Sequence, residues 1–384
     1  MSAAKFPFLN LADVNEPWMD EMAKAAERII RSGRYIGGEE VAKFEAELAA
    51  YLNVPHVVGV SNGLDAMRLA LRAYILLGKL NPRDDVIVPA NTYIATILAI
   101  TDAGLNPVLA EPDPATLNLD TSHLEEYLTD KTRAIMPVHL YGRTVWDENL
   151  VAFVKRHNLI VVEDAAQSIG SRATLAKGLF NSNHSGALGH AGAFSFYPTK
   201  NIGAIGDAGA LATNDPELAA AVRALANYGS DKRYHNIYQG FNCRLDPIQA
   251  AMLRVKLPHT DEENALRFPK ALAYQRTINN PLVVKPLITE QVIDNVWHQY
   301  IIRVLDNKRD AFRQELLKRG VETDIHYATP PHRQPCYADL PFYNSGNFPV
   351  TDLLASQVLS LPIARGTTVA DAAQIAKIIN EITV

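Results

Sequence analysis

Strand-like and helix-like patterns alternate along the chain from about Val54 to Asn227, and this alternation restricts the fold more than any other feature. Short apolar runs recur, and the segments between them carry apolar residues at helical spacing. The runs expected to be strands are His56–Val60, Asp85–Pro89, Pro107–Glu111, Ala134–His139 and Leu159–Glu163. The segments expected to be helices are Leu64–Leu77, Tyr93–Ala103, Asn149–His157 and Pro216–Tyr228. The sequence therefore predicts an α/β fold with a mainly parallel sheet covered by helices on both faces.

The flanking regions suggest a second, smaller unit. Further helices are expected at Asn15–Ser32, before the glycine-containing turn Gly33–Gly38, and from Asp246-Pro247 to Lys256, with a break at Pro258. After about residue 260 the pattern loosens, and the expected elements are a strand at Val296–Val304 and helices at Arg309–Arg319 and Val369–Thr383. We expect a large domain over residues 1–259, which includes the N-terminal segment, and a small α+β C-terminal domain over residues 260–384.

Composition excludes several classes of function. The chain has 384 residues, a formal net charge of −5 and scattered basic residues, which gives no reason to expect a nucleic-acid partner. It has no apolar stretch of about 18 residues, so no membrane span is expected. The segment Met1–Asn10 does not read as a secretory signal, and two cysteines cannot build a disulfide framework or a four-ligand zinc site. We expect a cytoplasmic protein without a structural metal.

The first candidate binding feature is the turn Ser61-Asn62-Gly63, which joins an apolar run to an amphipathic segment. Free backbone N–H groups at the start of a helix attract anions, and phosphate is the commonest of them. Ser-Asn-Gly is also an ordinary turn sequence, so this stretch alone leaves both interpretations open.

Two adjacent acids, Glu163 and Asp164, end the buried-strand pattern LIVV. Side chains alternate along a strand, so these two acids point to opposite faces. An acid at the carboxyl end of a central strand lies where such sheets bind ligands, although a helix cap or a surface carboxylate also fits the pattern. Gln167, three residues on, shares the same side of the turn.

A third strand end, in AGAFSFYPTKN, carries Ser195 and, five residues later, Lys200. A lone lysine is usually a solvated surface charge. The ordered set of a glycine turn, a strand-end acid, a serine and a lysine is what pyridoxal 5′-phosphate (PLP) requires. Its aldehyde needs an amine, its ring nitrogen needs an acid, and its phosphate needs N–H and hydroxyl donors.

Longer strings in the chain resemble one family of PLP enzymes. VEDAAQSIG, GAFSFYPTKNIGAIGDAGAL and YQGFNCRLDPIQAAMLRVKL resemble the DegT/DnrJ/StrS family, fold-type I PLP-dependent aminotransferases that act on nucleotide-linked keto sugars. The resemblance covers nearly the whole chain, from Phe8-Leu9-Asn10 to Leu361-Pro362. It implies the fold-type I architecture of a large and a small domain.

The resemblance also implies roles for particular residues. Lys200 would bond the cofactor aldehyde and shuttle protons, and Asp164 would pair with the ring nitrogen. The other implied cofactor contacts are Gln167 at the ring hydroxyl, Tyr93 stacked on the ring, and Ser195 with the Asn62–Gly63 backbone at the phosphate. Asn242 would reach the phosphate of the neighbouring subunit, which implies a homodimer with shared active sites. Leu64 stands where the family often has threonine, so backbone N–H groups must do more of the phosphate binding.

The implied reaction is transamination, in which L-glutamate leaves its amino group on the cofactor as pyridoxamine phosphate and the sugar ketone then receives it. Family members that deoxygenate sugars carry histidine in place of the lysine, so Lys200 argues for transamination. VSNGLDAMRLALRAY, PANTYIATILAI, LANYGSDKRYHN and IHYATPPHRQ resemble the subgroup that aminates C-3 of dTDP-3-keto-6-deoxyhexoses. The candidate contacts for the sugar and diphosphate are Tyr228, Lys232, Tyr234, His326 and Tyr327.

Three alternatives remain open at this point. The amino group could go to C-4 of a 4-keto sugar. The protein could be a PLP-binding regulator, although no separate DNA-binding region is visible. An α-amino-acid aminotransferase would need an arginine that binds the α-carboxylate, and neither Arg244 nor Arg333 is singled out. Thr199, where glycine is frequent, and the unusual loop Ala173–Ser182 depart from the family pattern and leave the acceptor contacts open.

Overall fold

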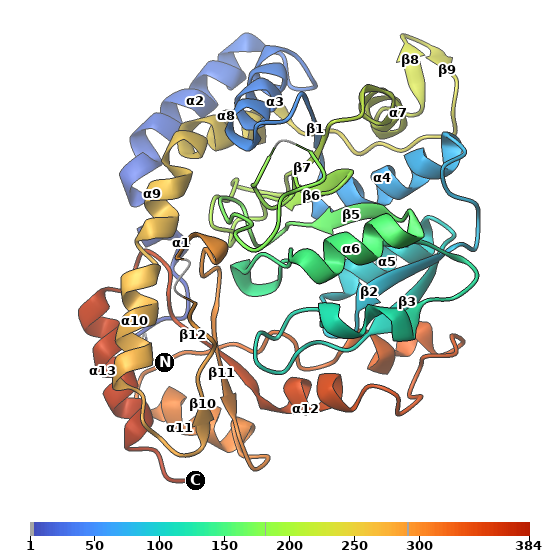
Figure 1. Ribbon diagram of the computed structural model, residues 1–384. Coiled ribbons are helices and arrows are strands. Elements are labelled where there is room, and N and C mark those ends of the chain that lie inside the picture. The colour runs from blue at the N-terminus through green and yellow to red at the C-terminus, as the bar shows by residue number, and fades with distance from the viewer. Residues whose placement is uncertain (1–3, 181, 290–291) are drawn as a thin grey trace.

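The computed structural model describes residues 4–180, 182–289 and 292–384 and has a seven-stranded sheet at its centre (Figure 1). The order of strands is β1-β7-β6-β5-β4-β2-β3, and only β7 runs antiparallel to its neighbours. The bounds are β1 His56–Val60, β2 Asp85–Pro89, β3 Asn106–Ala110, β4 Thr132–Ile135, β5 Ile160–Asp164, β6 Ala191–Ser195 and β7 Gly209–Thr213. The mainly parallel sheet predicted from the sequence is therefore confirmed.

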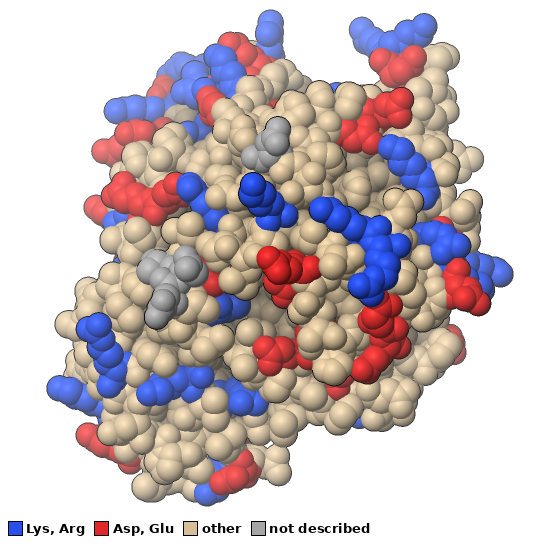
Figure 2. Space-filling view, viewed as in Figure 1, with Lys and Arg blue, Asp and Glu red and all other residues tan. Residues whose placement is uncertain are grey.

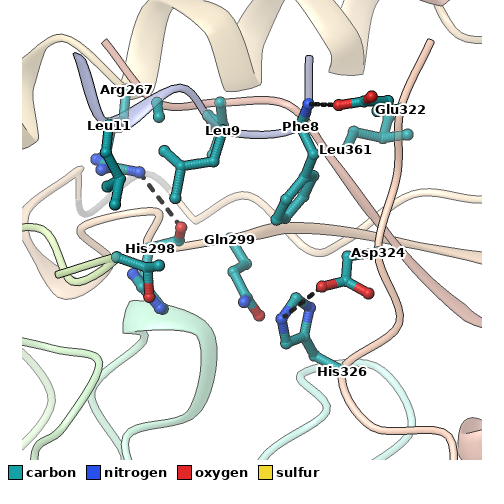
Figure 3. Close-up of a pocket in the computed structure, with 13 residues that line it drawn as sticks. Phe8, Leu9, Leu11, Arg267, His298, Gln299, Glu322, Asp324, His326 and Leu361 are labelled. Atoms are coloured by element: carbon teal, nitrogen blue, oxygen red, sulfur yellow. Dashed lines mark hydrogen bonds and ion pairs between the residues drawn. The ribbon is translucent and has the colours of Figure 1, made fainter. Parts of the chain in front are cut away.

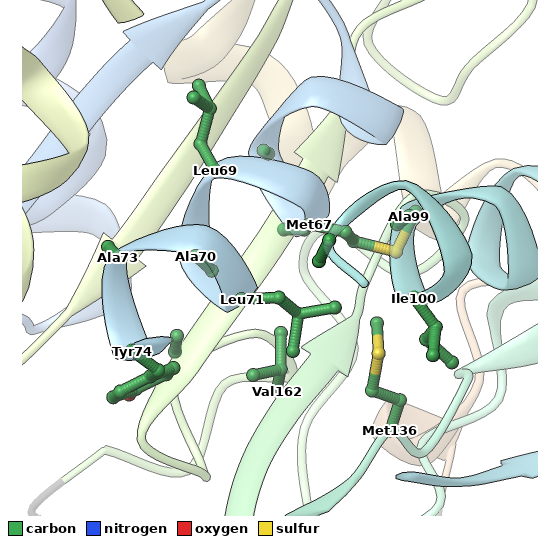
Figure 4. Packing of buried hydrophobic residues seen from close by; sticks show 14 of the residues in the cluster. Met67, Leu69, Ala70, Leu71, Ala73, Tyr74, Ala99, Ile100, Met136 and Val162 are labelled. Carbon is green, nitrogen blue, oxygen red and sulfur yellow. The ribbon is translucent and has the colours of Figure 1, made fainter. Parts of the chain in front are cut away.

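Helices cover both faces of this sheet, as the apolar spacing predicted. One face packs against α4 (Gly63–Leu76), α5 (Ile94–Asp102) and α7 (Pro216–Ala226). The other packs against α3 (Glu39–Leu52), α8 (Pro247–Lys256) and α6 (Glu148–His157). Figure 4 shows the packing of this first layer, with Leu71 of α4 and Ile100 of α5 lying beside Val162 of β5 and Met136, which follows β4. Burial of these side chains fixes which way each strand faces, and so which residues emerge at its carboxyl end.

Two segments before β5 differ from the sequence prediction by several residues. The expected helix Asn15–Ser32 is broken into α1 (Leu11–Asn15), a 3₁₀ turn at Glu16–Trp18 and α2 (Met19–Ser32). Pro17 in that turn has no N–H to donate, which explains the break. The strand expected at Ala134–His139 ends at Ile135, and the chain then turns so that the N–H of His139 donates to the Asp164 carbonyl at 3.0 Å.

The C-terminal residues form a second sheet with its own core. This sheet contains β10 (Val283–Val284), β11 (Tyr300–Val304) and β12 (Val358–Leu361), all antiparallel. Its core includes residues of α10 (Phe268–Thr277), α11 (Arg309–Lys318) and α13 (Val369–Asn380), and also Phe6 from the N-terminal segment. Besides short 3₁₀ helices, the other elements are α9 (Thr260–Ala265), α12 (Pro349–Gln357) and a hairpin of β8 (Ser230–Lys232) and β9 (His235–Asn236). The domain boundary at 259/260 stays a prediction.

The surface agrees with the charge analysis. On the face shown in Figure 2, Lys and Arg side chains are interspersed with Asp and Glu side chains. In the described ranges no helix has the length and apolarity needed to cross a bilayer. Cys243 is buried and Cys336 is exposed, and both are free thiols.

Candidate active site

A cavity of about 570 Å³ opens at the carboxyl ends of the parallel strands. Its walls come from the turns that follow β1, β2, β4, β5 and β6 and from two stretches of the C-terminal region. Of the predicted site residues, it is lined by Asn62, Gly63, Tyr93, Asp164, Gln167, Ser195, Lys200, His326 and Tyr327. The fold therefore brings together residues that lie more than 250 positions apart in the sequence.

Lys200 follows β6 in a tight turn, in which its N–H donates to the Tyr197 carbonyl at 2.8 Å. A Cβ on Gly203 would lie 2.4 Å from the Pro198 carbonyl oxygen, so the close return of the chain requires glycine there. Burial lowers the pKa of the Lys200 amine to about 8, and the negative charge of Asp164 opposes that fall. An amine with this pKa exists in both protonation states near neutral pH.

Asp164 ends β5 with its carboxyl group in the same cavity. Thr96 Oγ1 donates to Oδ2 at 2.8 Å and the Ala166 N–H donates to Oδ1 at 3.1 Å. Burial raises the pKa of Asp164, while these two hydrogen bonds and the charge of Lys200 oppose the rise. A cationic group placed against Asp164 would favour its ionised form, as the nitrogen of a protonated pyridine ring does.

Glu163, the adjacent acid, points to the opposite face, as strand alternation predicted. Its side chain is fully buried and accepts hydrogen bonds from four donors, all at 2.8 Å: the N–H groups of Gly186, Leu188 and Gly189, and His139 Nε2. The two acids therefore have separate roles, because Glu163 anchors the loop before β6 and only Asp164 faces the cavity.

The start of α4 forms one corner of the cavity. Asn62 caps the helix with its side chain, which accepts from the Asp65 N–H at 2.8 Å, so its backbone and that of Gly63 remain beside the cavity. A Cβ on Gly63 would lie 2.9 Å from Ser195 Cβ, so only glycine permits this approach. A helix N-terminus next to a serine hydroxyl suits a phosphate group.

Aromatic and amide side chains form another wall of the cavity. The rings of Tyr93 and Tyr327 lie with centroids 4.9 Å apart. Gln167 accepts from the Tyr141 N–H at 2.6 Å and donates to the Tyr327 hydroxyl at 3.0 Å. Burial lowers the pKa of His326 to about 4, with Asp324 opposing, so this ring is neutral at pH 7.

Four predicted site residues do not line this cavity. Lys232 and Tyr234 belong to the β8–β9 hairpin, which projects from the molecule (Figure 1), and Tyr234 is 87% exposed. Tyr228 lies just before this hairpin and is 51% exposed. Asn242 lies exposed near the base of that hairpin, where it pairs with Asn227 as a β-bridge. Within one chain these residues are separate from Lys200.

Sequence reasoning missed three polar residues of the site: Thr96, His298 and Gln299. The fully buried Thr96 orients Asp164, and the other two line the cavity beside Lys200. His298 Nδ1 lies 2.8 Å from Asn201 Oδ1, and burial lowers the pKa of His298 well below its ordinary value, aided by the charge of Lys200. The sequence did contain one indication, the adjacent polar residues His298 and Gln299 inside the expected strand Val296–Val304. In the structure this strand begins only at Tyr300.

The architecture is that of the fold-type I PLP-dependent transferases, and a lysine, a strand-end acid and a helix N-terminus meet at the carboxyl edge of its sheet. Comparison with known proteins then places it more closely. The chain belongs to the DegT/DnrJ/EryC1/StrS aminotransferase family, whose sequence model matches residues 18–380.

Individual relatives agree with this assignment. The chain is 42% identical to the dTDP-3-amino-3,6-dideoxy-alpha-D-galactopyranose transaminase of Aneurinibacillus thermoaerophilus, over 93% of this chain and 94% of that protein. It is also 42% identical to the dTDP-3-amino-3,4,6-trideoxy-alpha-D-glucose transaminase of Streptomyces venezuelae, over 94% and 91% of the two chains. The crystal structure of S. venezuelae DesV in complex with a ketimine intermediate superposes with a TM-score of 0.90 at 41% identity, covering 99% of this chain and 98% of that one.

Proposed function

We propose that this aminotransferase moves an amino group from L-glutamate to C-3 of a dTDP-linked 3-keto-6-deoxyhexose, in the biosynthesis of a deoxyamino sugar for lipopolysaccharide or another glycan. The observation that carries the proposal is the cavity shared by Lys200 and Asp164, in a chain 42% identical to two proteins named as transaminases of dTDP-3-amino sugars. The scattered charges and the absence of an apolar span in the described residues are compatible with a cytoplasmic enzyme.

The residues of the cavity fit PLP. Lys200 would bond its aldehyde, Asp164 its ring nitrogen, and the start of α4 with Ser195 its phosphate. Gln167 would lie at the ring hydroxyl, and Tyr93 would stack on the ring. When bound, PLP takes up the electron pair left on the substrate carbon when that carbon loses a proton.

The chain itself supplies the groups that move and hold protons. Lys200 Nζ, with its pKa lowered to about 8, accepts a proton as the amino donor is processed and returns one to the sugar carbon. Asp164 is fixed by Thr96 and the Ala166 N–H, so its carboxylate stays in one orientation throughout. Histidine at position 200 would be unable to bond the aldehyde in this way, which is why a lysine there supports transamination.

The working unit in this proposal is a homodimer with shared sites. Asn242 would reach the partner's phosphate site, and Tyr228, Lys232 and Tyr234 would contact the sugar nucleotide bound to the partner. Two features support this arrangement: these residues lie outside their own chain's cavity, and the hairpin that carries Lys232 and Tyr234 projects into solvent. A two-fold axis would make the exchange reciprocal.

The test is to incubate the purified enzyme and PLP with ¹⁵N-labelled L-glutamate and either a dTDP-3-keto- or a dTDP-4-keto-6-deoxyhexose. We expect the label at C-3 of the product, located by its coupling to the sugar proton in NMR spectra. Label at C-4 from the 4-keto substrate would assign the enzyme to 4-amination, and no labelled sugar from either substrate would contradict the proposed function.

A further inference from the structure

A second cavity, of about 410 Å³, adjoins the first, and Figure 3 shows the residues that line it. Four residues line both cavities: Thr199, His298, Gln299 and His326. Thr199 directly precedes Lys200, so a molecule in the second cavity lies next to the lysine turn. The residues assigned to PLP above do not line this second cavity.

Arg267 supplies a buried positive charge to the second cavity. Arg267 is only 7% exposed. Its Nη1 donates to the carbonyl oxygens of Trp297 and His298, both at the long distance of 3.3 Å. Over residues 4–180, 182–289 and 292–384, no carboxylate oxygen lies within 4 Å of its guanidinium. Burial lowers the pKa of Arg267 to about 10, so the group remains charged at neutral pH. A buried charge without a counter-ion is costly, which makes an anionic ligand the natural partner.

The other charges around Arg267 do not neutralise it. Glu263, whose negative charge raises the pKa of Arg267, is already paired with Arg365. Lys270 adds another positive charge at this end, where its Nζ donates to the Ala364 carbonyl at 2.8 Å. This end of the cavity therefore carries an excess of positive charge.

The acids of the second cavity lie at its other end. Figure 3 shows Glu322 and Asp324 opposite Arg267, with Gln299 between the two ends. Glu322 accepts a hydrogen bond from the Phe8 N–H at 3.2 Å, and Asp324 lies 3.7 Å from His326 Nε2. A carboxylate in this cavity would consequently bind at the Arg267 end.

Gln299 provides a second sign of a ligand. It is 8% exposed, and in the part of the chain that the structure describes its side-chain oxygen has no hydrogen-bond partner. A buried polar atom is normally satisfied, so this oxygen is available to an N–H or O–H group of a bound molecule. Because Gln299 also lines the first cavity, such a molecule can reach from Arg267 toward Lys200.

We propose that the second cavity binds a carboxylate of the amino donor, with Arg267 as the anion-binding residue and Gln299 as a further contact. The identity of the donor as an amino acid rests on the proposed function. A planar guanidinium binds a carboxylate through two parallel hydrogen bonds. The arginines raised from the sequence are engaged elsewhere, because Arg244 bonds Asn227 and Arg333 pairs with Asp352, and neither lines either cavity.

The test compares Arg267→Gln and Arg267→Lys with Arg143→Gln in the PLP-loaded enzyme. Arg143 is a matched control, because it is also buried but already has a carboxylate partner, Asp294, at 3.3 Å. The probe is glutarate, a five-carbon dicarboxylate without an amine, and its Kd is measured by calorimetry. Binding of dTDP and the rate of the half-reaction with L-glutamate are measured on the same variants, and melting curves confirm that each is folded.

We expect Arg267→Gln to raise the Kd for glutarate roughly 30- to 1,000-fold, which at about 1.4 kcal/mol per tenfold is about 2–4 kcal/mol. Arg267→Lys should recover part of the affinity, because lysine keeps the positive charge but cannot form the two parallel hydrogen bonds of a guanidinium. The control should lower the melting temperature and keep the Kd within about threefold of wild type. Binding of dTDP should be unchanged in all variants.

Three results would overturn the assignment: an unchanged Kd for glutarate in folded Arg267→Gln, no binding of glutarate to the wild type, or loss of dTDP binding alone. Loss of dTDP binding alone would show that Arg267 binds the nucleotide sugar instead of the amino donor. A wild type that binds glutarate through Arg267 but aminates no sugar would contradict the proposed function while the carboxylate site stands.

Discussion

Replacement of Glu163 by glutamine should cost stability, although the change removes only a charge and keeps the shape. Each carboxylate oxygen of Glu163 accepts two hydrogen bonds: Oε1 from the N–H groups of Leu188 and Gly189, and Oε2 from the Gly186 N–H and His139 Nε2. His139 cannot adapt to the change by moving its proton, because its Nδ1 already accepts from the Val145 N–H at 3.0 Å.

The size of the effect follows from these contacts. A glutamine amide accepts at one end only, so in either orientation its NH₂ group would face two donors, which both lose their acceptor. A buried donor left without an acceptor costs about 1–3 kcal/mol, which gives about 2–6 kcal/mol for the pair. With an unfolding entropy of about 0.8 kcal/mol/K for a chain of this length, we expect the melting temperature to fall by about 3–8 °C.

Asp164→Asn is the matched control, because the two acids are adjacent and only Asp164 faces the cavity. Burial raises the pKa of Asp164, so a neutral side chain is tolerated there and the melting temperature should not fall. Its kcat should drop instead, by roughly two to four orders of magnitude, equivalent to about 3–5 kcal/mol of transition-state stabilisation. Melting curves by circular dichroism and steady-state kinetics on both variants separate the two roles. A Glu163→Gln variant that melts within 1 °C of wild type, or an Asp164→Asn variant with normal kcat, would refute the reasoning.

Two further predictions concern the lysine and the subunit interface. The pKa of Lys200 is lowered to about 8, so its neutral, reactive amine should form as the pH rises through about 8. The rate at which the apo-enzyme binds PLP covalently should therefore rise with pH and reach half its maximum near pH 8. A midpoint above pH 10 would show that the lysine is solvated. Lys200→Ala should neither bind PLP covalently nor turn over. If Asn242 serves the partner's site, mixing inactive Lys200→Ala with inactive Asn242→Asp should restore roughly a quarter of wild-type activity per subunit, because statistical exchange makes half the dimers mixed and each has one intact site. Proven exchange without recovery, or an active monomer by light scattering, would contradict the shared site.

The strands and helices of the central sheet could be predicted from the sequence because their apolar spacing reports which faces are buried. The positions of Asp164 and Lys200 at the carboxyl edge could be predicted for the same reason, since Asp164 ends one buried strand and Lys200 follows the next, Ala191–Ser195, after a short turn. The bounds were less accurate where polar contacts end an element. The strand expected at Ala134–His139 stops at Ile135, because the Met136 N–H bonds the Ile87 carbonyl of β2 and pairing with β5 resumes only as an isolated bridge between Val138 and Asp164.

The contributions of the C-terminal region could not be predicted in the same way. His298, Gln299 and Arg267 have no local pattern that marks a site, and their roles depend on which cavity the folded chain places them beside. In the sequence, nothing distinguishes Arg267 from a solvent-exposed arginine. Only its burial without a carboxylate partner among the described residues distinguishes it from Arg143, which is equally buried and paired.

Asn201 follows the turn that ends in Lys200 and connects this turn by hydrogen bonds to the walls of both cavities. Its amide nitrogen donates to Asn264 Oδ1 at 2.6 Å and to the Val296 carbonyl at 3.3 Å, while its oxygen lies 2.8 Å from His298 Nδ1. Asn264 in turn donates to the carbonyl of Ile169, just beyond β5. The residue after Lys200 thus bonds the segment that carries His298, which walls both cavities, and connects it to the strand that carries Asp164. Because Arg267 donates to the His298 carbonyl, the positive end of the second cavity and the turn that carries Lys200 are joined through one hydrogen-bonded unit.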